Sequence, residues 1–67
     1  MLTGAQIRLA RAILGWQRQK LAKQSGVTLS GIIRAESGDG EGAITMSQNS
    51  ALQRALEAAG LVLMVLG

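Results

Sequence analysis

The chain has 67 residues, which suffice for one small domain and exclude a second. It contains no Cys and no His, so disulfide bonds, thiol chemistry and the commonest metal ligand are excluded. Only four carboxylates accompany these absences, and nothing in the sequence pairs a nucleophile with a general base. We therefore expect no enzymatic activity, no metal site and no cofactor.

Charge is distributed unevenly along the chain, whose net charge is +3. Residues 1–34 carry six Lys and Arg residues and no acid, whereas residues 35–67 carry one Arg against four acids. Such asymmetry is typical of a surface that faces a polyanion, although small domains are often mildly basic without such a role. Since no signal peptide and no apolar run of ~20 residues is present, we expect a cytoplasmic protein with no membrane association.

The first helix is predicted to begin after Thr3, which forms a capping box with Gln6, and to end at Gly15. Arg8 and Arg11 are expected on a solvated basic side. The apolar side, at ~100° per residue, is expected to contain Ile7, Ala10, Ile13 and Leu14, with Leu9 at its margin. Trp16, directly after the helix, is expected to anchor the core.

The second helix is predicted over residues 17–24 without a strong cap, because Gln17 stands where Ser or Thr is preferred. Gly26 then allows a sharp turn with a positive φ. The third helix begins at Thr28, runs to about Ser37, and directs Ile32 and Ala35 inward. Its outer sides are expected to carry Leu29, Ser30, Ile33 and Arg34. The glycine inside this helix, Gly31, is explained either by another surface such as a DNA backbone that comes close to it, or by sequence drift.

The last helix is predicted to begin with a second capping box, Thr45 with Gln48, and to end at Gly60. Asn49 interrupts its apolar face and needs a hydrogen-bond partner. The other members of that face are Met46, Leu52, Ala55, Leu56 and Ala59. Between the third and last helices, residues 37–42 form a Gly-rich loop that lacks the spacing of a phosphate loop or a calcium loop.

The C-terminal segment, residues 61–67, is predicted to be a short apolar strand with no partner strand in the chain. Because an apolar strand with open edges needs a partner, we expect it to pair with its copy across a two-fold axis. Packing against helices of the same subunit is the alternative. The expected dimer interface comprises Leu61, Val62, Leu63, Met64, Val65 and Leu66.

A helix-turn-helix pattern surrounds the predicted turn. Ala22 is small enough for two helices to cross closely, Gly26 makes the turn, and Val27 fills the space between the helices. Ile32 anchors the second helix of the pair on the core. The same pattern also fits a packed helical hairpin with no role in DNA binding.

From about residue 2 to residue 60 the sequence resembles the Cro/CI-type, or XRE-family, helix-turn-helix regulators of bacteria and phages. The resemblance rests on residues 2–8 (LTGAQIR), 14–16 (LGW), 21–22 (LA), 25–27 (SGV) and 55–61 (ALEAAGL). It implies an all-α, lambda-repressor-like bundle of four to five helices, with a helix-turn-helix DNA-binding domain over residues 1–60. It also implies a transcriptional regulator, a repressor in the simplest case, that binds a palindromic operator in double-stranded DNA as a homodimer.

The resemblance also implies which residues touch DNA. The recognition helix, residues 28–36, would enter the major groove, and Gln17 and Arg18 would hold phosphates. Base edges would be contacted by Thr28, Leu29, Ser30, Ile33 and Arg34. Arg34 can donate two hydrogen bonds to guanine, whereas Leu29 and Ile33 can contact only apolar surface such as thymine methyl groups.

Two other functions remain open from the sequence. An antitoxin or accessory regulator, which binds DNA but mainly grips a partner protein, would explain the apolar C-terminal segment and the apolar residues Leu29 and Ile33. A pure interaction module without DNA binding would explain the helical pattern alone.

Overall fold

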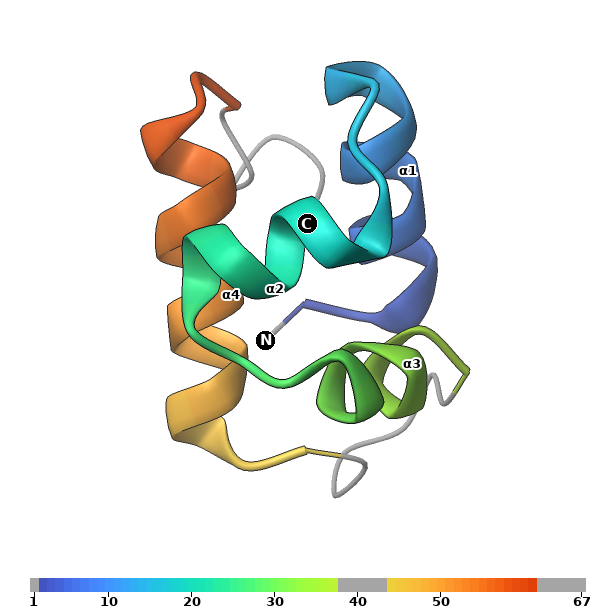
Figure 1. The fold of residues 1–67 in the computed structure, drawn as a ribbon, viewed down its shortest axis with the longest axis vertical. Helices are drawn as coiled ribbons and strands as arrows, with labels where there is room; N and C mark the ends of the chain where they lie inside the picture. The colour runs from blue at the N-terminus through green and yellow to red at the C-terminus, as the bar shows by residue number, and fades with distance from the viewer. Residues whose placement is uncertain (1, 38–43, 62–67) are drawn as a thin grey trace.

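Four α-helices make up the computed structural model, which describes residues 2–37 and 44–61 (Figure 1). They are α1 (Gly4–Leu14), α2 (Arg18–Ser25), α3 (Leu29–Ser37) and α4 (Met46–Ala58). No strand occurs in these two ranges, so the prediction of an all-helical chain is confirmed for them. The predicted Gly-rich loop, apart from Ser37, and the predicted strand, apart from Leu61, lie outside the described residues.

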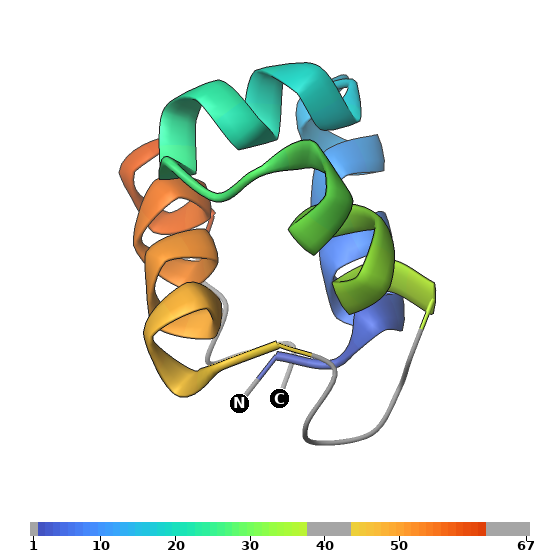
Figure 2. The same cartoon turned by 60° about the horizontal axis from the view of Figure 1, so that its bottom comes forward.

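The core lies where α2 connects the two sides of the bundle. In Figure 2, α2 spans the distance between α4 on one side and α1 with α3 on the other. It packs against both α4 and α3, while α1 packs against α3. Every helix contributes to one buried cluster, made of Ile7, Ala10, Leu21, Val27, Ile32, Ala35, Leu52 and Leu56. The inward position predicted for Ile32 and Ala35 is thereby confirmed.

Local hydrogen bonds set the helix ends as the sequence predicts. The Thr3 hydroxyl accepts a hydrogen bond from the Gln6 amide at 3.2 Å, and the Gln6 side chain accepts one from the Thr3 amide at 2.9 Å. Thr45 and Gln48 form the same capping box on α4. No side chain caps α2 at Gln17, also as predicted. The turn before α3 depends on Gly26, whose φ of 76° is left-handed.

The apolar face predicted for the first helix is partly wrong. Ile13 is 58% exposed and Leu9 is 50% exposed, whereas Arg11, expected in solvent, is only 18% exposed. The reason is that α1 packs mainly against α3, so its buried strip is narrow and centres on Gly4, Ile7 and Ala10. Met46 is likewise 78% exposed, so its predicted place on the apolar face of the last helix is also wrong.

At two positions, packing within the chain leaves little or no room for a side chain, and glycine stands there. A Cβ on Gly4 would lie 2.6 Å from the carbonyl oxygen of Ala35, so the start of α1 can approach α3 only as glycine. A Cβ on Gly31 would lie 3.0 Å from the Val27 Cγ1. Gly31 is buried, and the surface that comes close to it is the chain's own turn, so the predicted approach of another molecule there is wrong.

Asn49 has the partner that its buried position requires. Its amide nitrogen donates to the Leu2 carbonyl at 3.1 Å, and its Oδ1 accepts from the Leu2 amide at 3.1 Å. The side chain therefore satisfies both backbone groups of Leu2 and ties the start of the chain to α4.

Candidate nucleic-acid interface

A buried carboxylate, Glu36, lies beneath the junction of α1, α2 and α3. It is 1% exposed, although it is a charged residue near the end of α3. Its Oε2 accepts from the Arg11 Nε at 2.6 Å, and its Oε1 accepts from the Arg11 Nη2 at 3.0 Å and the Arg18 Nε at 2.9 Å. The backbone carbonyl of Glu36 also accepts a hydrogen bond from Arg8. One residue of α3 thus connects α1 and α2.

The ionisation of Glu36 follows from these contacts. Burial raises the pKa of this carboxyl, but hydrogen bonds and charge attraction from Arg11 and Arg18 outweigh burial and leave the pKa below its ordinary value. The group is therefore an anion at neutral pH. Two guanidinium groups face one carboxylate, so the cluster as a whole keeps a charge of +1.

The outer side of α3 is exposed along its length. Thr28, Leu29, Ser30, Ile33 and Arg34 are all exposed, as the sequence predicts for them. The hydroxyl of Thr28 accepts a hydrogen bond from the Gly31 amide at 3.1 Å and so acts as the cap of α3. Leu29 and Ile33, one helical turn apart, are 39% and 41% exposed and give this side of α3 an apolar part.

A groove joins this side of α3 to the start of α2. This α2–α3 groove is lined by Arg11, Gln17, Arg18, Gln19, Leu29 and Ile33. It brings together four residues that the sequence predicts to touch DNA, two from the beginning of α2 and two from α3. Thr28, Ser30 and Arg34 are exposed on α3 but do not line it. The groove therefore has basic and amide side chains on the wall from α1 and α2, and apolar side chains on the wall from α3.

The basic wall is strengthened by the end of α2. Gln17 occupies the N-cap position without a capping hydrogen bond, and Arg18 is the first residue of the helix. The positive end of the helix dipole lies here, and it favours an anion. None of the described residues that line the groove is acidic. These features make the wall suited to a phosphate group.

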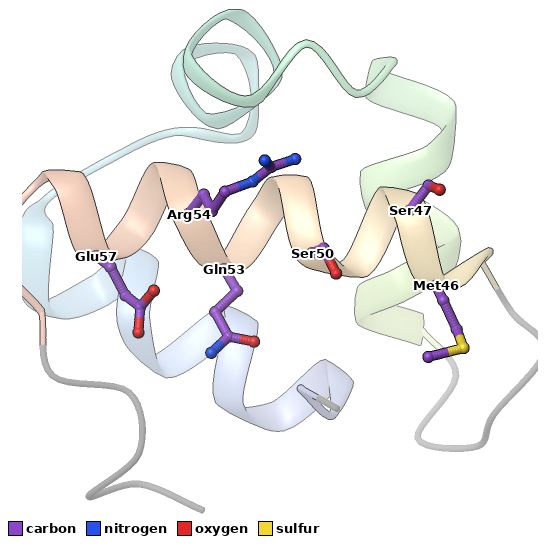
Figure 3. Close-up of a pocket in the computed structure, with 6 residues that line it drawn as sticks. All are labelled: Met46, Ser47, Ser50, Gln53, Arg54 and Glu57. Carbon is purple, nitrogen blue, oxygen red and sulfur yellow. The ribbon is translucent and has the colours of Figure 1, made fainter.

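A second groove lies on the outer face of α4 (Figure 3). All six residues that line this α4 groove come from that single helix: Met46, Ser47, Ser50, Gln53, Arg54 and Glu57. Figure 3 shows Arg54 and Glu57 pointing in different directions rather than toward a common point. The α4 groove therefore lacks converging groups that would define a ligand.

Sequence reasoning missed Glu36 and the inward position of Arg11. A signal existed, because Glu36 follows the inward-facing Ile32 by four residues, a spacing that keeps two side chains on the same helical face. An acid on an inward face requires a basic partner, and the basic residues of the first and second helices were available. Neither their distance from Glu36 nor their direction is contained in the sequence pattern.

The described residues contain neither a cluster of metal ligands nor a helix that could cross a membrane. No group of three or more His, Cys, Asp or Glu side chains that could hold a metal ion occurs in them. None of their helices has the length and apolar character needed to cross a membrane. Leu61, the described member of the predicted dimer interface, is partly buried against the core. The others, Val62 to Leu66, lie outside the described residues.

Known proteins add no further information about the site. No protein-family model matches the chain, and no curated protein and no solved structure matches it significantly.

Proposed function

We propose that the protein is a sequence-specific DNA-binding regulator of transcription, with α2 and α3 acting as a helix-turn-helix in a lambda-repressor-like domain. In this proposal α3 enters the major groove, and the start of α2 lies against the DNA backbone. The expected partner is double-stranded DNA, and the expected effect is repression by occupying a palindromic operator as a homodimer.

The observation that carries the proposal is the α2–α3 groove. It places Gln17 and Arg18, which can bind phosphate, beside Leu29 and Ile33, which can contact thymine methyl groups. In DNA recognition by a helix-turn-helix, one helix end holds the backbone while the next helix reads the bases. The groove supports this division because its two walls differ in chemistry and come from successive helices.

The exposed surface of α3 supports base recognition in a second way. Ser30 and Arg34 are exposed, and they are four residues apart on the helix. An arginine can donate two hydrogen bonds to guanine O6 and N7, and a serine can donate or accept one. The buried residues Ile32 and Ala35 fix this helix to the core, so its outer side has a defined orientation.

The experiment that tests the proposal is selection of duplexes from a random-sequence library by the purified protein, followed by footprinting on the enriched sequence. We expect a palindromic site with half-sites about 34 Å apart, because a two-fold dimer places its recognition helices one DNA turn apart. We also expect affinity to fall steeply as salt concentration rises. Failure to enrich any sequence, together with affinity that is independent of salt, would contradict the proposal.

Two variants separate base recognition from phosphate binding. Arg34→Ala should cost about 1–3 kcal/mol on the selected duplex and relax the preference at one base pair. Arg18→Ala should weaken binding to all sequences alike and reduce the salt dependence by about one ion pair. Equal losses on every sequence for both variants would contradict the assignment of Arg34 to base recognition.

A second function, that of an antitoxin or accessory regulator bound to a partner protein, is favoured by one specific observation. Leu29 and Ile33 expose apolar surface next to each other on α3, and a protein partner could cover it. Co-purification of a stoichiometric protein from the native host, with loss of that protein on Leu29→Ser, would support this second function. If the protein purifies without a partner protein and enriches a duplex, the result would support the first function, that of a DNA-binding regulator.

A further inference from the structure

Glu36 binds two guanidinium groups that differ in how many of their nitrogen atoms remain available. Arg11 uses its Nε and Nη2 for Glu36 and its Nη1 for the Trp16 carbonyl, at 3.0 Å. Arg18 uses only its Nε. Within residues 2–37 and 44–61 no acceptor lies within hydrogen-bonding distance of the Nη atoms of Arg18, whose side chain is 43% exposed. Each of the three guanidinium nitrogens of Arg11 therefore already makes a hydrogen bond within the protein, whereas both terminal nitrogens of Arg18 remain available.

We propose that Glu36 is a positioning residue, which fixes Arg18 so that its two terminal nitrogens bind one phosphate of the DNA backbone. The inference rests on the proposed function, and it assigns a role to a residue that cannot touch DNA itself. Glu36 is 1% exposed, so any effect on DNA binding must pass through the side chains that it holds.

The geometry favours such a role because a guanidinium is a planar fork. When Nε is held by a carboxylate, the two Nη atoms point away from it and can bind a phosphate through parallel hydrogen bonds. Arg18 lies on the wall of the α2–α3 groove at the uncapped end of α2, where the helix dipole also attracts an anion. The phosphate is therefore expected at this end of the groove.

The contact with Glu36 also lowers the entropic cost of binding. An arginine side chain loses rotamer freedom when it is ordered, and this loss opposes binding. The hydrogen bond to Glu36, 2.9 Å long, restricts Arg18 before DNA arrives. A cluster of two guanidinium groups and one carboxylate remains cationic, so the buried anion does not cancel the attraction for phosphate.

The test uses the full chain and duplexes selected by the wild-type protein, each carrying one methylphosphonate that neutralises a single backbone phosphate. For the wild type, we expect one position in each half-site at which this change lowers affinity by about tenfold because of Arg18. In Arg18→Ala that position should become neutral, whereas the other sensitive positions remain. If no position loses its sensitivity in Arg18→Ala, the inference is wrong although DNA binding stands.

Glu36→Gln is the decisive variant, since it keeps the shape of the side chain and removes its charge. We expect the position that depends on Arg18 to become neutral in Glu36→Gln as well. If Glu36 were important only for folding, Glu36→Gln would bind every duplex more weakly. It would still lose affinity when the methylphosphonate is at the position that depends on Arg18. That result would overturn the inference. Arg54→Ala, on α4, is the matched control and should keep the wild-type pattern.

Arg18→Lys provides an independent variant in case Glu36→Gln does not fold. A lysine keeps the charge, but its single nitrogen cannot hold Glu36 and offer a two-pronged contact to a phosphate. We expect Arg18→Lys to lose sensitivity at the same position, and retained sensitivity would overturn the inference. A wild-type protein that selects no duplex would overturn the proposed function together with this inference.

Discussion

The two grooves of the molecule are similar in size and different in construction. The α2–α3 groove measures about 440 Å³ and the α4 groove about 550 Å³. The first is built from α1, α2 and α3 above a buried ion cluster, whereas the second is built from one helix. In the first, Arg18 is held by Glu36; in the second, no described residue forms an ion pair or a hydrogen bond with the Arg54 side chain. Volume alone therefore does not distinguish a groove whose side chains are held in place from one whose side chains are not.

The contacts that hold the lining side chains in place therefore distinguish the two grooves better than their volumes do. A side chain held before the ligand arrives loses less entropy on binding than one that moves freely. Among the residues that line the two grooves, Arg11 and Arg18 have such support from Glu36. If this support matters, substitutions in the two grooves should differ in their effects on stability and on DNA binding.

The largest effect is expected from removing the support itself. Glu36→Ala leaves Arg11 without its buried partner, and it should lower the free energy of unfolding by about 3–5 kcal/mol. A domain of this size has little stability to lose, so the variant should be largely unfolded at room temperature. Urea denaturation followed by circular dichroism measures the change. Glu57→Ala, on the α4 groove, should change the stability by less than about 0.5 kcal/mol, and equal stability of the two variants would contradict the comparison.

The next effect is expected at the close approach of α1 to α3. Gly4→Ala places a methyl group against the Ala35 carbonyl oxygen, so it should destabilise the protein by about 1–3 kcal/mol. The sign is informative, because the same substitution in an uncrowded helix would stabilise it by up to about 1 kcal/mol. Thermal denaturation distinguishes the two outcomes, and a stabilised variant would show that α1 does not need this approach to bring Arg11 to Glu36.

A smaller effect is expected when exposed apolar residues of the two grooves are compared. Leu29→Ser should lower affinity for the selected duplex by about tenfold, since it removes an apolar contact with a base. Met46→Ser is the matched change on the α4 groove and should alter the affinity by less than about twofold. Fluorescence anisotropy with labelled duplex measures both. Equal losses for the two variants would mean that the grooves do not differ in DNA binding.

The smallest effect is a dependence of stability on acid. The pKa of Glu36 in the folded protein is lower than its ordinary value of 4.5, so the unfolded chain binds the proton more readily. The stability that Glu36 contributes is therefore complete above about pH 4.5 and is lost as the pH falls through its folded-state pKa. Urea denaturation at a series of pH values should show the wild type and Glu36→Gln converging in stability on acidification. A gap that stays constant with pH would contradict this prediction.

Several features of the fold could be predicted because they depend on neighbours in sequence. Both capping boxes, the uncapped start at Gln17 and the positive φ at Gly26 are of this kind. The exposure of Leu29 and Ile33 was also predictable, because the inward face of the same helix is fixed by Ile32 and Ala35. Each of these requires contacts or spacings within about one or two helical turns.

The predictions that were wrong depend on which helix packs against which. Ile13 and Met46 have the periodicity of core residues, but no helix covers them in the described structure. Gly31 is small because of Val27, four residues away, and not because of another molecule. The periodic spacing of apolar residues predicts that one face of a helix is apolar. It does not predict how much of that face the neighbouring helices cover.

The starts of the helices and the turn between α2 and α3 can be read from the sequence, because they depend on local hydrogen bonds. The outward side of α3 can also be read from it, because it depends on helical spacing. Only the tertiary structure decided that Glu36 is buried and that it joins Arg11 to Arg18 across 18 to 25 positions of the chain. The physical reason is that a buried charge is tolerated only where opposite charges converge on it, and that convergence is a property of helix packing.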